Sequence, residues 1–242
     1  HDNAHFMRYG GSGMGTLTPF NFDSSTEYKI FFVGNVSHHN RCLVPWAKIG
    51  KISDGNGIIV DVNIDRKGGD TTYVGRTLLS NNLVYANGGG GIVVTTARGV
   101  DIVHNTVFDN VQSPELAAQG WGDIFIGGPK PGSNDVRVIN NVVVSRNSAG
   151  PFIFHSSTGV LAENNVFSGG KVVPGDLSHS SNLIQDPRWL SASIDPSKAD
   201  FHLKKGSPAI AAGRSGLFWL PAVDMEGKAR PRDRAPAAGA YE

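Results

Sequence analysis

An asparagine recurs after short apolar runs through the first 165 residues, and its spacing constrains the fold more than any other feature. In four of the five copies an Asn or a Gly stands directly before it. The recurring residues are Asn35, Asn82, Asn105, Asn141 and Asn165. Successive copies are 47, 23, 36 and 24 residues apart. These intervals indicate a coil of 23–24 residues, with one double interval and one coil that carries an insertion.

A second series of β-branched runs precedes the asparagines. Its members are 57–60, 91–94, 123–126 and 152–154, with 13–17 as an earlier copy. Short strands of this kind become stable when like units stack above and below them. An Asn repeated at one level then bonds the backbone of adjacent coils. The sequence therefore predicts an all-β fold, a right-handed parallel β-helix, in which the asparagines are turn and ladder residues rather than ligands.

The pattern changes near residue 182, where the alternating runs stop and prolines become frequent. Segments 186–189 and 201–204 predict a short hairpin. We predict coils over 1–181 and a loop-rich C-terminal capping segment over 182–242 that covers the open end of the solenoid. The first three residues are similar to 108–110, the tail of a coil, so we expect the coils to lack their N-terminal part.

Composition excludes several classes of protein. The chain has 22 basic and 21 acidic residues, which gives no case for a nucleic-acid partner. A single cysteine, Cys42, excludes an internal disulfide framework, and we expect its thiol to be buried. No apolar run reaches about 18 residues, so we expect no membrane span. We expect a monomer.

Several segments resemble one protein family. The closing residues 201–203, 207–210, 230–231 and 239–242 resemble the end of secreted bacterial right-handed β-helix proteins, a superfamily that includes the polysaccharide lyases. Segments 51–61, 75–78 and 81–92 resemble the same pectate-lyase-like superfamily. The resemblance implies a secreted, carbohydrate-active protein whose partner is an extracellular polysaccharide.

The calcium-dependent pectate lyases with an Asp-Asp-Gly-Phe-Asp type motif are the nearest comparison. Asp54-Gly55 matches that motif, whereas Ser53 and Gly57 stand where the family has acidic residues. The position of the family's catalytic base is occupied here by Val93, which cannot accept a proton.

A uronate lyase must neutralise a carboxylate and remove the proton on C5. For the first task we predict Ca²⁺ held by Asp54, Asp61 and Asp65, because Ca²⁺ prefers carboxylate oxygens. For the second we predict Lys67 or Arg98 as the base. Asp61 and His155 complete the catalytic candidates.

Alternation along the strands predicts an outward column of Asp61, Thr95, Asp123 and His155 on one face. Loops beside a β-helix shape its groove, so function concentrates on them. The loop 41–56 and the insertion 111–134 supply further substrate-binding candidates. The substrate-binding candidates are Trp46, Lys51, Asp123 and Trp121. Residues 115–119 predict one helical turn.

Two other functions stay open. A glycoside hydrolase needs two carboxylates on the same groove, and Asp54 with Asp61, or Asp61 with Asp123, are the candidate pairs. A non-catalytic glycan-binding or surface protein is favoured by the valine at the family's base position.

Overall fold

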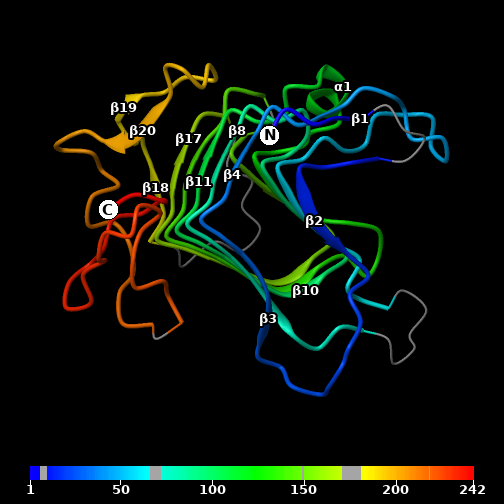
Figure 1. Ribbon diagram of the computed structural model, residues 1–242, viewed down its shortest axis with the longest axis horizontal. Coiled ribbons are helices and arrows are strands. Elements are labelled where there is room, and N and C mark those ends of the chain that lie inside the picture. The colour runs from blue at the N-terminus through cyan, green and yellow to red at the C-terminus, as the bar shows by residue number, and fades with distance from the viewer. Residues whose placement is uncertain (6–9, 66–71, 149, 171–180, 218) are drawn as a thin grey trace.

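The computed structural model describes residues 1–5, 10–65, 72–148, 150–170, 181–217 and 219–242 (Figure 1). Its strands form a solenoid of three parallel sheets, and each coil contributes one strand to each sheet in turn. Neighbouring strands of a sheet are therefore one coil apart in the sequence. The predicted parallel β-helix is confirmed.

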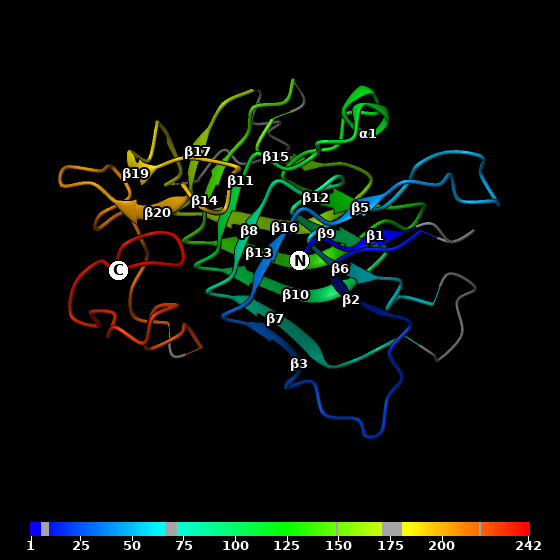
Figure 2. The same cartoon turned by 45° about the horizontal axis from the view of Figure 1, so that its top comes forward.

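Three sheets make the sides of the solenoid. Sheet 1 comprises β2 (Met14–Leu17), β6 (Ile58–Asp61), β9 (Ile92–Thr95), β12 (Ile124–Gly127) and β15 (Phe152–Phe154). Sheet 2 comprises β3 (Tyr28–Val33), β7 (Arg76–Ser80), β10 (Arg98–Val103), β13 (Asn134–Ile139) and β16 (Thr158–Glu163). Sheet 3 comprises β4 (Val36–His38), β8 (Leu83–Tyr85), β11 (Thr106–Phe108), β14 (Val142–Val144), β17 (Val166–Ser168) and β18 (Leu183–Ile184). Figure 2 shows the strands of sheet 2 lying in successive layers.

The remaining elements are short. β1 (Ala4–His5) pairs in parallel with β5 (Arg41–Cys42), and α1 (Pro114–Ala118) is the predicted helical turn. β19 (Trp189–Ser191) and β20 (Asp200–Leu203) form the predicted antiparallel hairpin. Among the described residues, no helix is long and apolar enough to cross a bilayer.

Alternation along each strand fills the core. In sheet 1 the first and third residues of β6, β9 and β12 point inward and are fully buried. These residues are Ile58, Val60, Ile92, Val94, Ile124 and Ile126.

The recurring asparagines form one continuous ladder at the corner between sheets 2 and 3. In each coil the backbone N–H and the side-chain Nδ2 donate to Oδ1 of the Asn in the next coil, with Nδ2–Oδ1 distances of 2.8–3.0 Å. The members are Asn35, Asn82, Asn105, Asn141, Asn165 and Asn182. The ladder role predicted for the five recurring asparagines is confirmed, and Asn182 is a further member that was not predicted.

The prediction that the 47-residue interval between Asn35 and Asn82 contains two coils is wrong. Strand β3 pairs directly with β7, and Asn35 donates directly to Asn82. The interval is therefore one coil enlarged by excursions on both sides of β6, including the loop 41–56.

A second ladder follows the corner between sheets 3 and 1. Asn3, Asn40, Asn87 and Asn110 each donate through Nδ2 to the next member, at 2.7–2.9 Å. The last acceptor is a carboxylate oxygen of Asp123. The 23-residue interval between Asn87 and Asn110 could have indicated this ladder in the sequence. Neither residue, however, is preceded by Asn or Gly, as most members of the first ladder are.

The C-terminal segment lies along the outside of sheet 3, as the orange-to-red ribbon in Figure 1 shows. Trp189 and Phe201 pack on the outward rings of Tyr85 and Phe108, with ring centroids 5.3–5.4 Å apart. Val142 and Val166 extend this apolar surface over two further coils. Because the outward positions of sheet 3 are apolar, the segment covers a flank across several coils, rather than only the open end that we predicted.

Candidate functional site

The outer face of sheet 1 carries two rows of side chains, set by the strand register. One row contains Gly15, Ile59, Val93, Phe125 and Ile153. In the other row Asp61 pairs with Thr95, and Thr95 pairs with Gly127. His155 follows β15, and its backbone N–H donates to the carbonyl of Ile126. The predicted column is therefore correct for Asp61, Thr95 and His155, whereas Gly127 occupies the position that we assigned to Asp123.

Three aromatic rings lie together on this face, in the coils that contain β12 and β15. Trp121 stacks on Phe125 with centroids 4.8 Å apart and an interplanar angle of 13°, and His155 meets Phe125 edge-on at 5.0 Å. Gly127 lets these rings pack against the strand, since a Cβ there would lie 3.0–3.1 Å from both the Phe125 and His155 rings. Trp121 is half-buried and His155 is exposed. Phe125 is buried beneath the other two rings, so Trp121 and His155 provide the accessible aromatic surface on which a sugar ring can pack.

A cationic side chain lies where β6 and β9 end. Asn63 holds the backbone of Arg98 by two hydrogen bonds, from Nδ2 to the Arg98 carbonyl at 2.9 Å and from the Arg98 N–H to Oδ1 at 2.6 Å. Asp61 is half-buried two residues before Asn63, and Arg98 is exposed. The structure thus brings Asp61 and Arg98 to the same edge of sheet 1. Asp65 lies a short distance after Asp61 in the sequence and is half-buried, and its backbone N–H donates to the hydroxyl of Thr72. Lys67 lies outside the described residues.

The other edge of sheet 1 holds Asp54, Trp46 and Lys51. Asp54 accepts a hydrogen bond from Ser53 at 2.5 Å, and Trp46 and Lys51 face each other across an isolated bridge. Lys51 also borders a cavity of about 390 Å³ between this loop and α1. The two predicted loops therefore do meet beside sheet 1.

The three predicted calcium ligands do not lie within 4.8 Å of one another in the structure. Asp54 precedes β6 and Asp61 ends it, so the strand lies between them. Among the described residues, only His1, Asp2 and His38 bring three possible ligand atoms within 4.8 Å of one another. Asp54 and Asp61 lie at opposite ends of β6, so the strand does not bring this hydrolase pair together.

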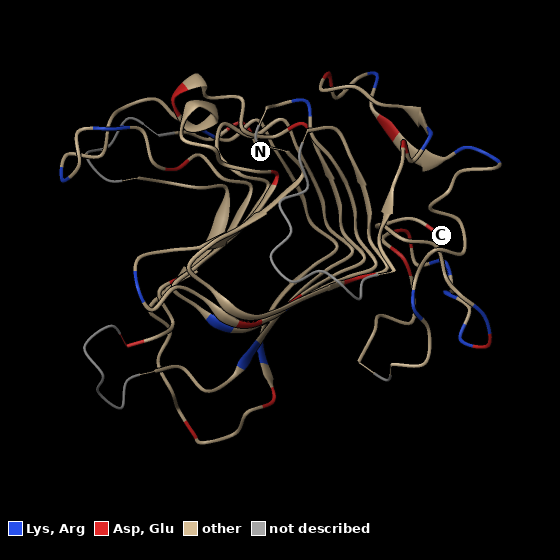
Figure 3. Cartoon of the chain, turned by 180° about the vertical axis from the view of Figure 1, so that it is seen from behind, with Lys and Arg blue, Asp and Glu red and all other residues tan. Residues whose placement is uncertain are grey.

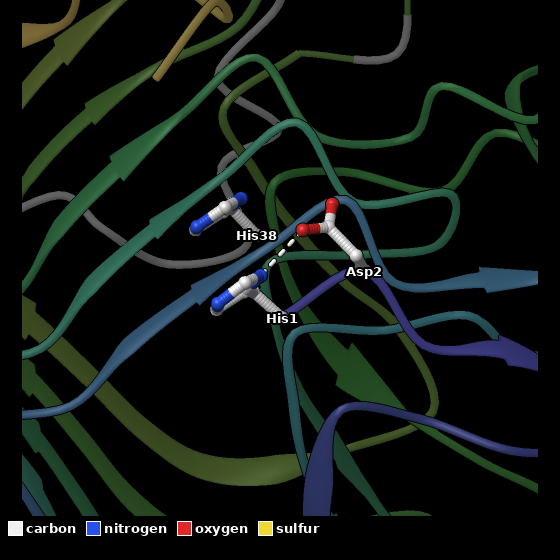
Figure 4. A group of neighbouring side chains, drawn as sticks. All are labelled: His1, Asp2 and His38. Atoms are coloured by element: carbon white, nitrogen blue, oxygen red, sulfur yellow. Dashed lines mark hydrogen bonds and ion pairs between the residues drawn. The ribbon is translucent and has the colours of Figure 1, made fainter. Parts of the chain in front are cut away.

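In the group of His1, Asp2 and His38, the two imidazole rings stack on each other (Figure 4). The His1 and His38 rings are 4.7 Å apart with an interplanar angle of 5°, and His38 continues the stack onto Tyr85 at 4.8 Å. Nitrogen lone pairs lie in the ring plane, so two stacked parallel rings do not direct them at one ion. Burial, followed by the neighbouring His39, lowers the pKa of His38.

Asp123 is a ladder residue. Its side chain is fully buried, and Oδ1 accepts from the backbone N–H of Asn110 at 2.7 Å and from the Asn110 side chain at 2.9 Å. Burial raises its pKa to about 7. Asp123 directly precedes β12 and is buried at the corner, so it does not reach the outer face of sheet 1. The structure therefore does not bring Asp123 together with Asp61, the second hydrolase pair.

An ion-pair network on sheet 2 was missed by sequence reasoning. Asp101 is fully buried and accepts hydrogen bonds from Arg76, Arg137 and the hydroxyl of Tyr28. Figure 3 shows these basic and acidic segments side by side on the strands. Burial and the bond to Asp101 raise the pKa of Tyr28. The donors come from three coils, so no local sequence motif predicts the network. Because these charged groups pair with one another, the network needs no substrate to explain it.

Comparison with known proteins adds no family to these observations. No protein-family model matches the chain, and no curated protein sequence is detectably similar to it.

Proposed function

We propose that this chain is a secreted, carbohydrate-active β-helix protein of the pectate-lyase-like kind, which binds an extracellular uronic-acid polysaccharide along the outer face of sheet 1 and cleaves it by β-elimination. One observation carries the proposal: Asp61, Thr95 and His155 are aligned on that face, with Arg98 at its edge and the Trp121–Phe125 stack beside the row.

Because of their spacing, we assign these residues to different sugar units in the proposed complex. Asp61 and His155 are three coils apart, and coils are about 4.8 Å apart, which gives about 14 Å. Two groups at that separation cannot act on one glycosidic bond. Asp61 and Arg98 therefore serve the reacting unit, while His155 and Trp121 hold a unit farther along the chain of sugars.

β-Elimination removes the proton on C5, moves that electron pair into a new C4–C5 double bond and expels the glycosidic oxygen on C4. Arg98 is the base candidate among the described residues, and Lys67 stays the second candidate. Ca²⁺ stays a proposed cofactor: Asp61 and Asp65, without Asp54, would hold it together with the substrate carboxylate and would stabilise the charge that develops there.

Glycan binding without turnover is the second candidate function. It is favoured by Val93, which is fully buried at the position where the resemblance places a catalytic base. In that case the aromatic rings would bind a polysaccharide and no unsaturated product would form.

We expect Trp121→Ala to weaken polysaccharide binding about tenfold, because a buried aromatic contact contributes about 1–3 kcal/mol. Calorimetry with polygalacturonate, alginate and a neutral glucan measures the effect. Trp219→Ala is the matched control, since Trp219 packs on Arg137 at sheet 2. Trp121→Phe should restore most of the affinity, and thermal melts check that each variant is folded. Equal losses in the two alanine variants would place the glycan elsewhere.

A further inference from the structure

A cavity of about 270 Å³ lies between the corner of sheets 2 and 3 and the C-terminal segment. It is separate from sheet 1 and is small for a ligand pocket, since such pockets measure about 300–1,000 Å³. Its polar side chains come from His104, Arg214, Ser215, Arg230 and Arg232, and no acidic residue is among the described residues that border it. Leu217, Leu220 and several prolines form the apolar remainder of the wall.

Two of the arginines are already paired outside the cavity. Arg214 pairs with Glu163, and Arg230 pairs with Glu242 at 3.2 Å. Arg232 is exposed and forms no ion pair with any described residue. The lining therefore carries one uncompensated positive charge, which fits a singly charged anion.

The His104 ring borders this cavity, and Asn140 fixes its orientation. The Asn140 amide is oriented by the backbone of Arg214, whose N–H donates to Oδ1 at 2.7 Å and whose carbonyl accepts from Nδ2 at 2.9 Å. The same Nδ2 lies 2.9 Å from Nε2 of His104, so Nε2 must accept and the proton of the neutral imidazole is on Nδ1. That Nδ1 is buried beside the backbone of Ala237 and Gly239, so it is not a free donor and His104 forms a neutral wall of the cavity.

Arg230 also borders the cavity, and the protein holds its guanidinium in place. Its side chain is 5% exposed, and its two terminal nitrogens donate to Asn81, Glu242 and the carbonyls of Ala237 and Gly239. Its Nε has no exposed surface, so it does not donate to a molecule in the cavity. The exposed Arg232 is therefore the cationic side chain, unpaired among the described residues, that such a molecule can reach.

We propose that this cavity binds a small organic carboxylate with an apolar body. The carboxylate accepts hydrogen bonds from the arginine-rich side and neutralises the charge of Arg232, whose fork of N–H groups suits a carboxylate. The apolar body packs on Leu217 and Leu220.

The test is calorimetry on the full chain with benzoate, compared with benzyl alcohol, which lacks the charge, and galacturonate, which lacks the apolar body. We expect saturable binding of benzoate, weaker binding of galacturonate and none of benzyl alcohol. Arg232→Gln should weaken benzoate binding about tenfold, because a charge-assisted hydrogen bond is lost. Arg234→Gln is the matched control, as it removes a nearby exposed arginine that does not border the cavity.

Absence of saturable benzoate binding, equal binding of benzyl alcohol, or equal losses in the two arginine variants would each overturn the proposal. Both substitutions are on exposed residues, so folding is checked by circular dichroism and is expected to be unchanged. Polysaccharide binding at sheet 1 should be the same in both variants, which separates this site from the proposed function.

Discussion

Asn165→Ala is expected to destabilise the protein by about 4 kcal/mol, which lowers the melting temperature by about 8–16 °C for a domain of this size. Asn165 is fully buried, and its Nδ2 donates to the Val138 carbonyl at 2.8 Å and to Asn182 at 2.9 Å. Its Oδ1 accepts from both the backbone and the side chain of Asn141. Alanine leaves these buried groups without partners, and each such group costs about 1–3 kcal/mol.

Asn164→Gly is the matched control in the same Asn-Asn step. Asn164 has a φ of 54°, which glycine adopts freely, and its side chain bonds Ala212 and Ser181 at the half-buried outside of the corner. We expect a loss of about 1 kcal/mol or less. Chemical denaturation of both variants gives the comparison, and similar losses would contradict the ladder as the main stabiliser of this corner.

Asp123→Asn is expected to stabilise the protein by up to about 4 kcal/mol above pH 7 and to leave its stability near pH 4 almost unchanged. Burial raises the pKa of Asp123 from 3.8 to about 7 in the folded chain. The folded state therefore keeps a proton that the unfolded state releases, so wild-type stability falls as the pH rises from about 4 to 7. A shift of about three pKa units corresponds to about 4 kcal/mol.

Asparagine removes this ionisation while its Oδ1 can still accept both bonds from Asn110. Denaturation at a series of pH values from 4 to 8 measures the difference between variant and wild type. The gap should open between pH 4 and 7 and then stay constant. Parallel profiles would show that Asp123 is not the group that titrates in this range.

The period of the sequence was enough to predict the fold, because a ladder Asn repeats at one level of every coil. It was not enough to count the coils between Asn35 and Asn82, since a coil with long excursions and two ordinary coils have the same length in the sequence. Asp123 was assigned to the groove because the alternation was started one residue early. Strand β12 begins at Ile124, so Asp123 belongs to the corner.

The charged clusters could not be predicted, because their members are far apart in the sequence. Arg76 and Asp101 are on neighbouring coils, and Arg230 reaches Asn81 from the opposite end of the chain. The apolar outward residues of sheet 3, such as Tyr85 and Phe108, were a usable signal that the C-terminal segment would cover that flank.

The most direct test of the proposed function is the release of unsaturated, ultraviolet-absorbing product from polygalacturonate and alginate, with and without Ca²⁺. We predict product formation by the wild type, retained activity in Arg234→Gln, and a loss of at least about 100-fold in Arg98→Gln, in keeping with the removal of a general base. No product from either polymer, or an Arg98→Gln variant as active as the wild type, would contradict the assignment of the reaction to this edge of sheet 1.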